Sequence, residues 1–329
     1  MLKTMVGGWR NGFVSTWKTD NAGVSTSVQI RIPTVSSGTY NCVVYWGDGS
    51  SSTITTYNDA AWTHTYAGAG TYTVNIVGTF VGIQFANGGD KLKILSVLNW
   101  GAGFRLGTTQ GIYFYGCSNL QFLMKDVLNL SGTTSLNGAF IGCPINNPTI
   151  GQWNVSAVTD FNNTFNSCSS LAADLSAWNV SSATVMSGML AVTRVTSSLN
   201  NWNVSNVTNM SSFLAFNTVY NASLSSWNTS KVTTMASMFQ NCTAFNQDVS
   251  TWDIRALTAA TSMFTSSGFN ITNYDKLLDN TTGWPSQATI QSNVVFSAGS
   301  AHYSAGAPTT GRAILTGTKL WVITDGGTP

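Results

Sequence analysis

Apolar and polar positions recur through the middle of the chain with a period of about 25 residues, a length within the range of known structural repeats. One tryptophan marks each period, at positions Trp153, Trp178, Trp202, Trp227 and Trp252. Further apolar residues stand three residues before each tryptophan and about five, eight and twelve residues after it. A single repeat of this kind cannot bury its own apolar face. The pattern therefore predicts an array of stacked repeats.

Each repeat has a polar and apolar order that suggests local structure. The segment around the tryptophan, such as 199–204, is short and bounded by polar residues, which favours a short strand. A serine three residues after the tryptophan is a favoured helix N-cap, and apolar residues then follow at helical spacing. We therefore expect a strand, a capped turn and a short helix in each unit. These serines are Ser156, Ser181, Ser205 and Ser230.

The array extends upstream in a weaker form. Four cysteines share one phase of the period, and a phenylalanine precedes each of them by three residues. We count about six to seven units between residues 95 and 270. The cysteines are Cys117, Cys143, Cys168 and Cys242, and the phenylalanines are Phe114, Phe140, Phe165 and Phe239.

The flanking regions follow other patterns. Residues 27–80 alternate apolar and polar positions between glycine-rich turns, which predicts a small antiparallel β-sandwich. Residues 271–329 lose the tryptophan period and are expected to cap the array, with short helices near 274–278 and 311–315 and a strand at 320–324. The predicted domains are an N-terminal arm at 1–12, a sandwich at 13–90, a solenoid at 91–270 and a cap at 271–329.

Composition narrows the classes of function. Charged residues make up 8% of the 329 residues, with 14 basic and 12 acidic side chains, so Ser, Thr, Asn and Gly must cover the surface. The chain has no basic cluster, and we expect no binding to nucleic acid. It has no run of 18 apolar residues, so we expect no membrane insertion. Its start lacks the apolar core of a secretory signal, so we expect either a mature fragment or a protein that reaches its destination outside the Sec pathway.

Two groups of motifs carry a resemblance to known families. Trp46-Gly47-Asp48-Gly49, His64-Thr65-Tyr66 and Gly70-Thr71-Tyr72-Thr73-Val74 resemble a polycystic-kidney-disease (PKD) domain. That resemblance covers most of the predicted sandwich and implies an immunoglobulin-like β-sandwich that serves as a spacer or interaction module outside cells. The opening stretch at 13–21 instead resembles the strand that starts bacterial surface proteins with BspA-like repeats.

The repeats resemble the BspA-like leucine-rich repeats of bacterial surface proteins. One near-consensus stretch runs from Asn201-Trp202-Asn203-Val204 to Met210. A second consists of Met238-Phe239 with Cys242, followed by Phe245-Asn246-Gln247-Asp248. The resemblance covers about half of the chain. It implies a chain that is mainly β with short helices, in which an immunoglobulin-like sandwich precedes a leucine-rich-repeat solenoid and a C-terminal cap. Compact versions resemble proteins carried on the virions of tailed bacteriophages.

Several residues offer candidate chemistry, and the structural interpretation is favoured for each. Asp48 suits a turn better than a calcium site, because no run of oxygen ligands surrounds it. His64 is expected on a strand beside the core, with no Ser, Cys or Asp partner indicated, and His302 is uninformative. The cysteines, with Cys42, are expected to be buried free thiols rather than zinc ligands or disulfides.

The repeated aromatic and amide positions leave alternatives open. The tryptophans could be sugar-binding platforms, although their strict phase with leucine and valine favours core packing. The Asn that follows each tryptophan is either a backbone-bonding residue or part of an exposed polar row. We predict no catalytic, cofactor-binding or metal-binding residues, and the ligand-binding residues are unknown from the sequence.

Three functions compete. The first is a non-enzymatic virion surface protein, such as a tail fibre, tail-tip or capsid-decoration component, and the second is a bacterial cell-surface adhesin. The third is a glycan hydrolase, which needs two close carboxylates and is disfavoured because the solenoid acids do not share one phase. Those acids are Asp160, Asp174, Asp248 and Asp253.

The partners follow from the first function. We expect other virion structural proteins, a homo-oligomer, and host surface glycan or protein recognised by the polar solenoid. The sandwich and the arm, which carries Lys3, Trp9 and Arg10, are expected to attach the protein, while the solenoid projects.

Overall fold

The computed structural model describes residues 11–329, which are mainly β with a few short helices, as predicted. The chain divides into two compact units. The first unit extends to residue 157 and includes 168–171, and the second contains 158–167 and 172–329. The predicted domain boundaries after residues 12, 90 and 270 stay predictions.

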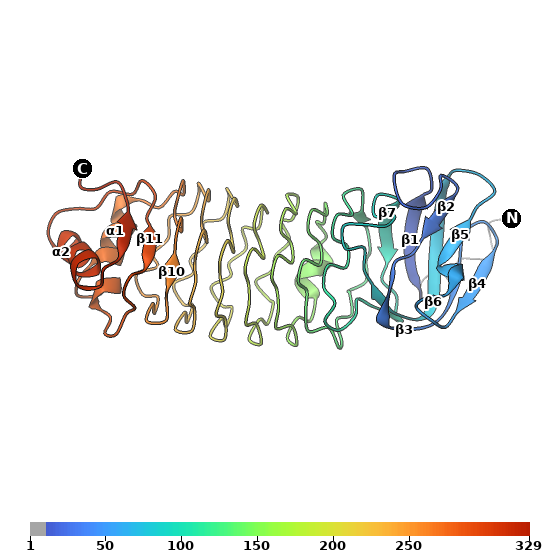
Figure 1. Cartoon of the computed structure of the whole chain (residues 1–329), viewed down its shortest axis with the longest axis horizontal. Coiled ribbons are helices and arrows are strands. Elements are labelled where there is room, and N and C mark those ends of the chain that lie inside the picture. The colour runs from blue at the N-terminus through green and yellow to red at the C-terminus, as the bar shows by residue number, and fades with distance from the viewer. Residues whose placement is uncertain (1–10) are drawn as a thin grey trace. The chain divides into compact units, whose positions relative to one another are not determined.

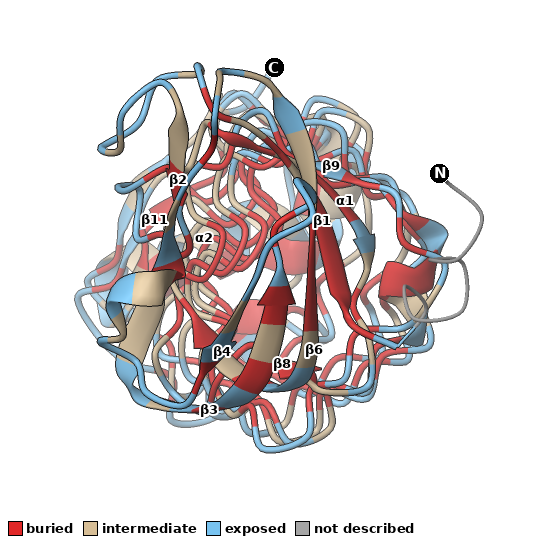
Figure 2. Ribbon diagram, turned by 90° about the vertical axis from the view of Figure 1, so that its right-hand side faces the viewer, coloured by how far each residue is buried: buried red, intermediate tan, exposed pale blue. Residues whose placement is uncertain are grey.

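The first unit is organised around a seven-stranded sheet, whose buried positions are red in Figure 2. Its strands follow the order β4-β3-β6-β1-β7-β9, and β8 pairs with β6. A separate antiparallel pair is formed by β2 (Gln29–Arg31) and β5 (Thr63–Thr65). The bounds in the large sheet are β1 Phe13–Lys18, β3 Thr34–Tyr45, β4 Ser51–Ile54, β6 Thr71–Ile83, β7 Ile94–Asn99, β8 Phe104–Arg105 and β9 Gln121–Phe122.

Apolar alternation in these strands builds an aromatic core. Every second side chain of a strand faces the same side, so the apolar positions of β1 and β6 reach one interior. The rings of Phe13 and Phe104 stack at 4.5 Å, and that of Phe13 meets Phe80 edge-on at 5.7 Å. The predicted strands near 13–18, 29–31, 43–45 and 72–76 are therefore confirmed.

The predicted N-terminal arm falls mostly outside the description. Lys3, Trp9 and Arg10 lie outside the described residues, so the expected attachment through the arm stays a prediction. The end of the arm, at Gly12, is held by the Asn99 side chain, whose Nδ2 donates to the Gly12 carbonyl oxygen at 3.0 Å.

In the second unit, successive repeats lie side by side, as Figure 1 shows for the turns that lead to β10. Parallel bridges join Asp160 to Val185 and continue through Asn209 and Thr234 to Ala259. The unit ends with a three-stranded parallel sheet and two helices. Their bounds are β10 Ala259–Ala260, β11 Val295–Ser297, β12 Val322–Thr324, α1 Ile271–Leu278 and α2 Ala307–Ala313.

A series of backbone hydrogen bonds connects each repeat to the next in this unit. The N–H groups of Phe161, Asn163, Phe165 and Ser167 donate to carbonyl oxygens of the following repeat at 2.7–3.0 Å. The same alternate-residue pattern recurs in the later repeats up to Asn241. The backbone polar groups of one turn are thus satisfied by its neighbour, which fixes the register between repeats.

The helix predicted in each repeat is wrong for the second unit, where residues 158–270 form no helix. Two residues four positions apart in each turn have positive φ, which is incompatible with a right-handed helix. The apolar residues at helical spacing are buried, but they are buried by turns. These left-handed pairs are Asn163 and Ser167, Gly188 and Val192, Ser212 and Phe216, Ser237 and Asn241, and Ser262 and Ser266.

The strand predicted around each tryptophan of this unit is also wrong. The backbone N–H of Trp202 donates to the Leu199 carbonyl at 3.0 Å, which closes a turn over the segment expected to be extended. The bonds of Trp178, Trp227 and Trp252 to the residue three positions earlier repeat this geometry. In this unit, the parallel bridges lie instead seven residues after each tryptophan.

Candidate functional site

The repeated tryptophans belong to the core. All five are at most 3% exposed, which confirms core packing over an exposed sugar platform. The indole N–H groups of the last three also donate to a carbonyl oxygen one repeat earlier. Trp202 donates to Leu175 at 3.0 Å, and Trp227 donates to Leu199 at 2.8 Å. These tryptophans therefore tie successive repeats together.

The cysteines are buried free thiols, as predicted. The Sγ of Cys143 lies 3.0 Å from the Phe114 carbonyl oxygen, and the Sγ of Cys242 lies 2.8 Å from that of Leu214. Burial raises the pKa of both thiols to about 12. The reactive thiolate is therefore suppressed, and these cysteines serve packing.

The asparagine after each tryptophan forms a bond within its own repeat. The Asn203 Oδ1 accepts from the backbone N–H of Ser205 at 3.2 Å. Asn154, Asn179 and Asn228 do the same, and Asp253 substitutes for them in the last repeat. This bond is an Asx-turn within one repeat rather than a ladder between repeats. The four asparagines are all exposed, which confirms the exposed polar row. The serines predicted to cap helices are the donors in these turns.

An exposed threonine follows each tryptophan by six residues and forms a row that we call the threonine row. In the second unit, each threonine hydroxyl from Thr184 onward donates to the carbonyl oxygen of the preceding row member. Thr208 reaches Thr184 at 3.2 Å, and Thr233 reaches Thr208 at 3.0 Å. The members in this unit are Thr159, Thr184, Thr208, Thr233 and Thr258, all exposed.

The geometry of the threonine row suits recognition of an extended ligand. Parallel neighbours in a β-ladder stand about 4.8 Å apart, so the row repeats at that spacing. Since each hydroxyl proton is directed at a carbonyl, the hydroxyl oxygen presents acceptor lone pairs, beside a methyl group. The row therefore offers a regular, uncharged series of acceptors and small apolar groups. Sequence reasoning missed it, although its phase is visible in the repeat.

The solenoid acids are used in turns. The Ser176 side chain and backbone lower the pKa of Asp174, and the Arg255 guanidinium lowers that of Asp253. Burial opposes the shift at Asp248, but bonds from Ser250 and the Lys276 ammonium at 3.1 Å hold its pKa below the usual value. A general acid in glycoside hydrolysis needs a raised pKa. These three carboxyl groups are shifted the opposite way.

His64 has partners, which corrects the prediction that none is indicated. Its Nε2 lies 2.7 Å from Asp48 Oδ2 and 3.4 Å from Ser50 Oγ. The contact joins β5 to the turn at 47–49, and its two residues are 16 positions apart in the chain, so the spacing alone does not predict it. The prediction that His64 lies on a strand is confirmed, since it is part of β5.

The geometry of these three residues differs from that of a catalytic triad. A triad uses both ring nitrogens of histidine, one toward serine and one toward the acid. Here one nitrogen faces both groups, and the Ser50 hydroxyl donates to Asp48 Oδ1 at 2.6 Å. The His64 ring stacks on Trp46 at 4.7 Å. Asp48 thus orders the turn, which supports its predicted structural role.

The remaining candidates provide little chemistry. His302 is exposed, and its Nδ1 lies 3.3 Å from the Gly327 carbonyl oxygen. Within residues 11–329, no cluster of three or more His, Cys or Asp side chains is arranged to hold a metal ion. The helices of the same part of the chain are too short or too polar to cross a membrane.

A buried pair of charges in the first unit was missed by sequence reasoning. Asp90 and Lys93 are both fully buried. Asp90 accepts from the backbone N–H groups of Val24, Ser25 and Arg31 at 2.7–3.0 Å. We call these two residues and the loop at 24–31 the charged clamp. These partners are far apart in the sequence and meet only in the folded chain. No local sequence motif therefore predicts the charged clamp.

Lys93 completes the clamp from the other side. Its ammonium donates to four oxygens of the same loop: Ser25 O, Ser25 Oγ, Thr26 O and Gln29 O, at 2.7–3.0 Å. Burial lowers the pKa of Lys93, and the carboxylates of Asp90 and Asp20 oppose that shift. The clamp therefore fixes the backbone of the loop against residues 90–93.

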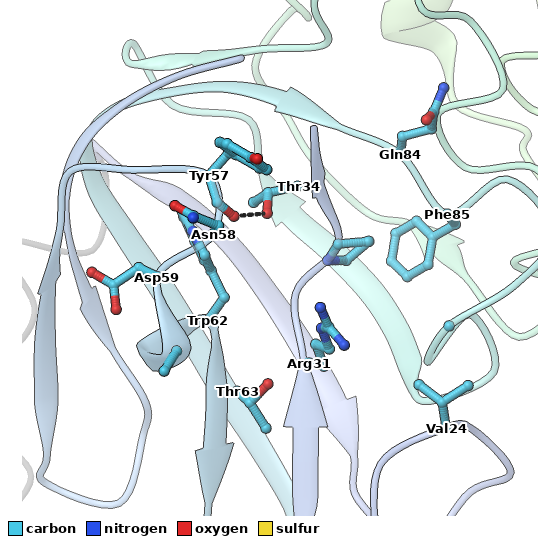
Figure 3. Close-up of a pocket in the computed structure, with 13 residues that line it drawn as sticks. Val24, Arg31, Thr34, Tyr57, Asn58, Asp59, Trp62, Thr63, Gln84 and Phe85 are labelled. Carbon is cyan, nitrogen blue, oxygen red and sulfur yellow. Dashed lines mark hydrogen bonds between the residues drawn. The ribbon is translucent and has the colours of Figure 1, made fainter. Parts of the chain in front are cut away.

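A pocket of about 400 Å³ lies beside this loop, in the first unit. Figure 3 shows its side chains, with Arg31 between the wall that carries Trp62 and the wall that carries Phe85. Trp62 and Phe85 are buried, whereas Tyr57 is 45% exposed. Polar groups on the lining come from Arg31, Thr34, Asn58, Asp59, Thr63 and Gln84.

The pocket is held by hydrogen bonds within its walls. Thr34 Oγ1 donates to the Tyr57 carbonyl at 2.6 Å, and the Trp62 indole donates to the Thr56 carbonyl at 2.9 Å. Asp59 Oδ1 accepts from the Ala61 N–H at 2.9 Å and begins the short 3₁₀ turn Ala60–Trp62. The clamp holds Val24 and Arg31 on the opposite wall. Hydrogen bonds within the protein thus order both walls.

One family matches the chain. The family described as "Mycoplasma protein of unknown function, DUF285" matches residues 112–197 and 191–302, which together exceed half of the chain. The matched residues contain the tryptophan repeats and the threonine row. Comparisons with curated proteins and with solved structures give no match.

Proposed function

The chain belongs to the DUF285 family, and we propose that it is a non-enzymatic surface protein whose repeats adhere to glycan or protein on a host. The threonine row carries this proposal. It is exposed, uncharged and repeated in register, which suits an extended ligand with its own regular polar groups. The turn-bound acids of the repeats, with their lowered pKa values, support the non-enzymatic assignment.

We propose that the repeats form a BspA-like leucine-rich-repeat solenoid. The constant register between bridged positions, one tryptophan period apart, and the buried tryptophans and cysteines support this assignment. We also propose that the two sheets of the first unit form a PKD-like, immunoglobulin-like sandwich. The buried Trp46, whose carbonyl accepts from the Tyr66 hydroxyl at 3.0 Å, supports it, because both residues belong to the PKD-like motifs. An experimental structure tests both assignments.

The first location that we propose is the virion of a tailed bacteriophage. The sandwich would attach the protein to the particle, and the repeats would be displayed on its surface. This location rests on the resemblance to compact repeat proteins of such particles. The second location is the bacterial cell surface, which the bacterial genus in the family's description favours. Mass spectrometry and immunogold labelling of purified virions and of bacterial envelopes distinguish them. Detection of the protein on bacterial envelopes but not on virions overturns the proposed virion location.

Adhesion is tested on the threonine row itself. We expect the double variant Thr208→Asp, Thr233→Asp to lose binding to bacterial strains that bind the unchanged protein, because two charges enter an uncharged row. Thr243→Asp is the matched control. Thr243 is an exposed threonine of the same unit outside the row, and its hydroxyl also donates one repeat back, to Thr218. Unfolding curves of all variants check that the fold is retained.

The outcomes are separable. Loss of binding in the double variant, with binding kept in Thr243→Asp, supports the row as the adhesive face. Equal loss in both, or no loss in the double variant, overturns it. Treating the cells with periodate or with protease beforehand then shows whether the receptor is a glycan or a protein.

A further inference from the structure

The pocket beside the charged clamp has the chemistry of a small-ligand site. It is concave and mixes aromatic walls with a few polar groups, which is typical of such sites. Its volume of about 400 Å³ falls within the usual range for ligand pockets. All of its lining residues belong to the first unit, so the site does not depend on the repeats.

Arg31 is the distinctive group of this pocket. Its backbone N–H is bound to Asp90 at 2.7 Å, which anchors the residue. Its guanidinium makes no ion pair or hydrogen bond with any residue from 11 to 329. A guanidinium pairs with planar carboxylates through two parallel hydrogen bonds. The pocket lining therefore includes an exposed guanidinium, carried on an anchored backbone, that is available for an anionic group.

The other lining groups select the kind of anion. Asp59 lies on the same lining, so a single negative charge is tolerated better than the double charge of a phosphate monoester. Tyr57, which is 45% exposed, offers ring surface, against which the C–H face of a sugar packs. Asn58 supplies an amide that bonds hydroxyl groups. The Gln84 Nε2 already donates to the Gln110 and Gly111 carbonyl oxygens, which leaves its Oε1 as an acceptor.

We propose that this pocket binds a saccharide that carries a carboxylate, with Arg31 pairing with the carboxylate and Tyr57 packing against the sugar ring. Sialic and uronic acid residues share this chemistry. The charged clamp holds Val24 and Arg31 in place before the ligand arrives, which lowers the ordering cost of binding. The site is separate from the threonine row, so each can be lost without the other.

The test measures binding of four small probes to the full chain by NMR titration or calorimetry. The probes are the methyl glycosides of N-acetylneuraminic acid, glucuronic acid and galactose, and the methyl ester of the glucuronide. We expect saturable binding of at least one acid. We expect its ester and the galactoside to bind at least about ten-fold more weakly, because they lack the charge that a guanidinium recognises.

Variants assign the binding to the pocket. Arg31→Gln is expected to weaken binding of the acid by at least about ten-fold, and Tyr57→Ala to weaken all probes. Arg194→Gln is the matched control, since Arg194 is an exposed arginine of the second unit. Unchanged unfolding curves are expected for Arg31→Gln, because its guanidinium contacts nothing that the fold requires.

Several results would overturn the proposal. These are failure of both acids to bind, equal affinity for acid and ester, equal loss in Arg31→Gln and Arg194→Gln, and tighter binding of glucose 6-phosphate than of either acid. None of them bears on adhesion by the threonine row, which is tested with Thr208 and Thr233 in the other unit.

Discussion

The two units hold their polar groups in different ways. In the first unit, Asp90 and Lys93 are buried charges with several backbone partners each, and from residue 11 onward this arrangement occurs once in the unit. In the second unit, the repeats use uncharged groups in contacts that recur from turn to turn, such as the Trp202 indole and the Thr208 hydroxyl.

This difference has consequences for stability and for function. A contact that recurs can be lost at one place with the neighbouring repeats still bonded to each other, so damage is local and graded. When a buried charge loses its partners, no other group replaces them, so the loss of stability of the unit is large and abrupt. A repeated array also presents one surface many times, whereas a unique loop can shape one pocket.

The largest effect is expected for Trp202→Ala. This change removes a buried ring and leaves the Leu175 carbonyl without the indole donor, so we expect the second unit to lose about 3–5 kcal/mol. Hydrogen exchange should show faster opening in the two adjacent repeats and less change further away. Thr243→Val serves as the exposed control. A loss below about 1 kcal/mol would contradict tight core packing.

Next comes Lys93→Met, which keeps the side-chain stem and removes the ammonium. Four oxygens of the loop lose their donor and Asp90 stays buried, so we expect the first unit to lose about 3 kcal/mol in denaturant unfolding. Lys125→Met, at an exposed lysine of the same unit, is the matched control. If both variants unfold alike, the clamp does not stabilise the loop.

Sequence patterns predicted the elements that depend on apolar spacing. The alternation around Val74 gave a correct strand, and the phase of Trp202 and Cys242 gave correct burial. The same patterns predicted the wrong backbone conformation within a repeat. Spacings of three and four fit a helix, but Ser212 and Phe216 adopt left-handed φ values, so the same side chains are buried by turns.

The sites were harder to predict than the fold. The pocket needs Arg31, Tyr57 and Gln84, which are far apart in sequence and have no motif in common. The clamp joins Lys93 to Gln29, which is 64 residues earlier in the chain. The threonine row was also missed, although its six-residue distance from each tryptophan is visible in the sequence.

A smaller effect on stability is expected when the pH is lowered. Burial opposes the shift, but bonds from Ser50 and His64 lower the pKa of Asp48 to about 2, against 3.8 ordinarily. Ionised Asp48 therefore stabilises the first unit above about pH 4, and this contribution of at most about 2 kcal/mol is lost as the pH falls toward 2. Asp48→Asn should destabilise at pH 7 and match the unchanged protein near pH 2. A constant difference across that range would contradict the assignment.

The smallest effect concerns the left-handed positions of the repeats. Val192 has φ +57°, which is unfavourable for a β-branched side chain, while the equivalent position in a later repeat is Asn241 at φ +58°. Asparagine tolerates this conformation, and the Val192 N–H bond to the Ala215 carbonyl does not depend on the side chain. Val192→Asn should therefore stabilise the second unit by about 1 kcal/mol.

Gly188, four residues earlier in the same turn, provides the opposite test. It has φ +61°, and a Cβ there would meet the Asn163 side chain, so Gly188→Ala should destabilise the unit by about 1 kcal/mol or more. Thermal unfolding of the two variants measures both signs in one turn. If Val192→Asn lowered stability as Gly188→Ala does, the valine would contribute more by packing than it costs by strain. The turns would then depend on their side chains as closely as the charged clamp does.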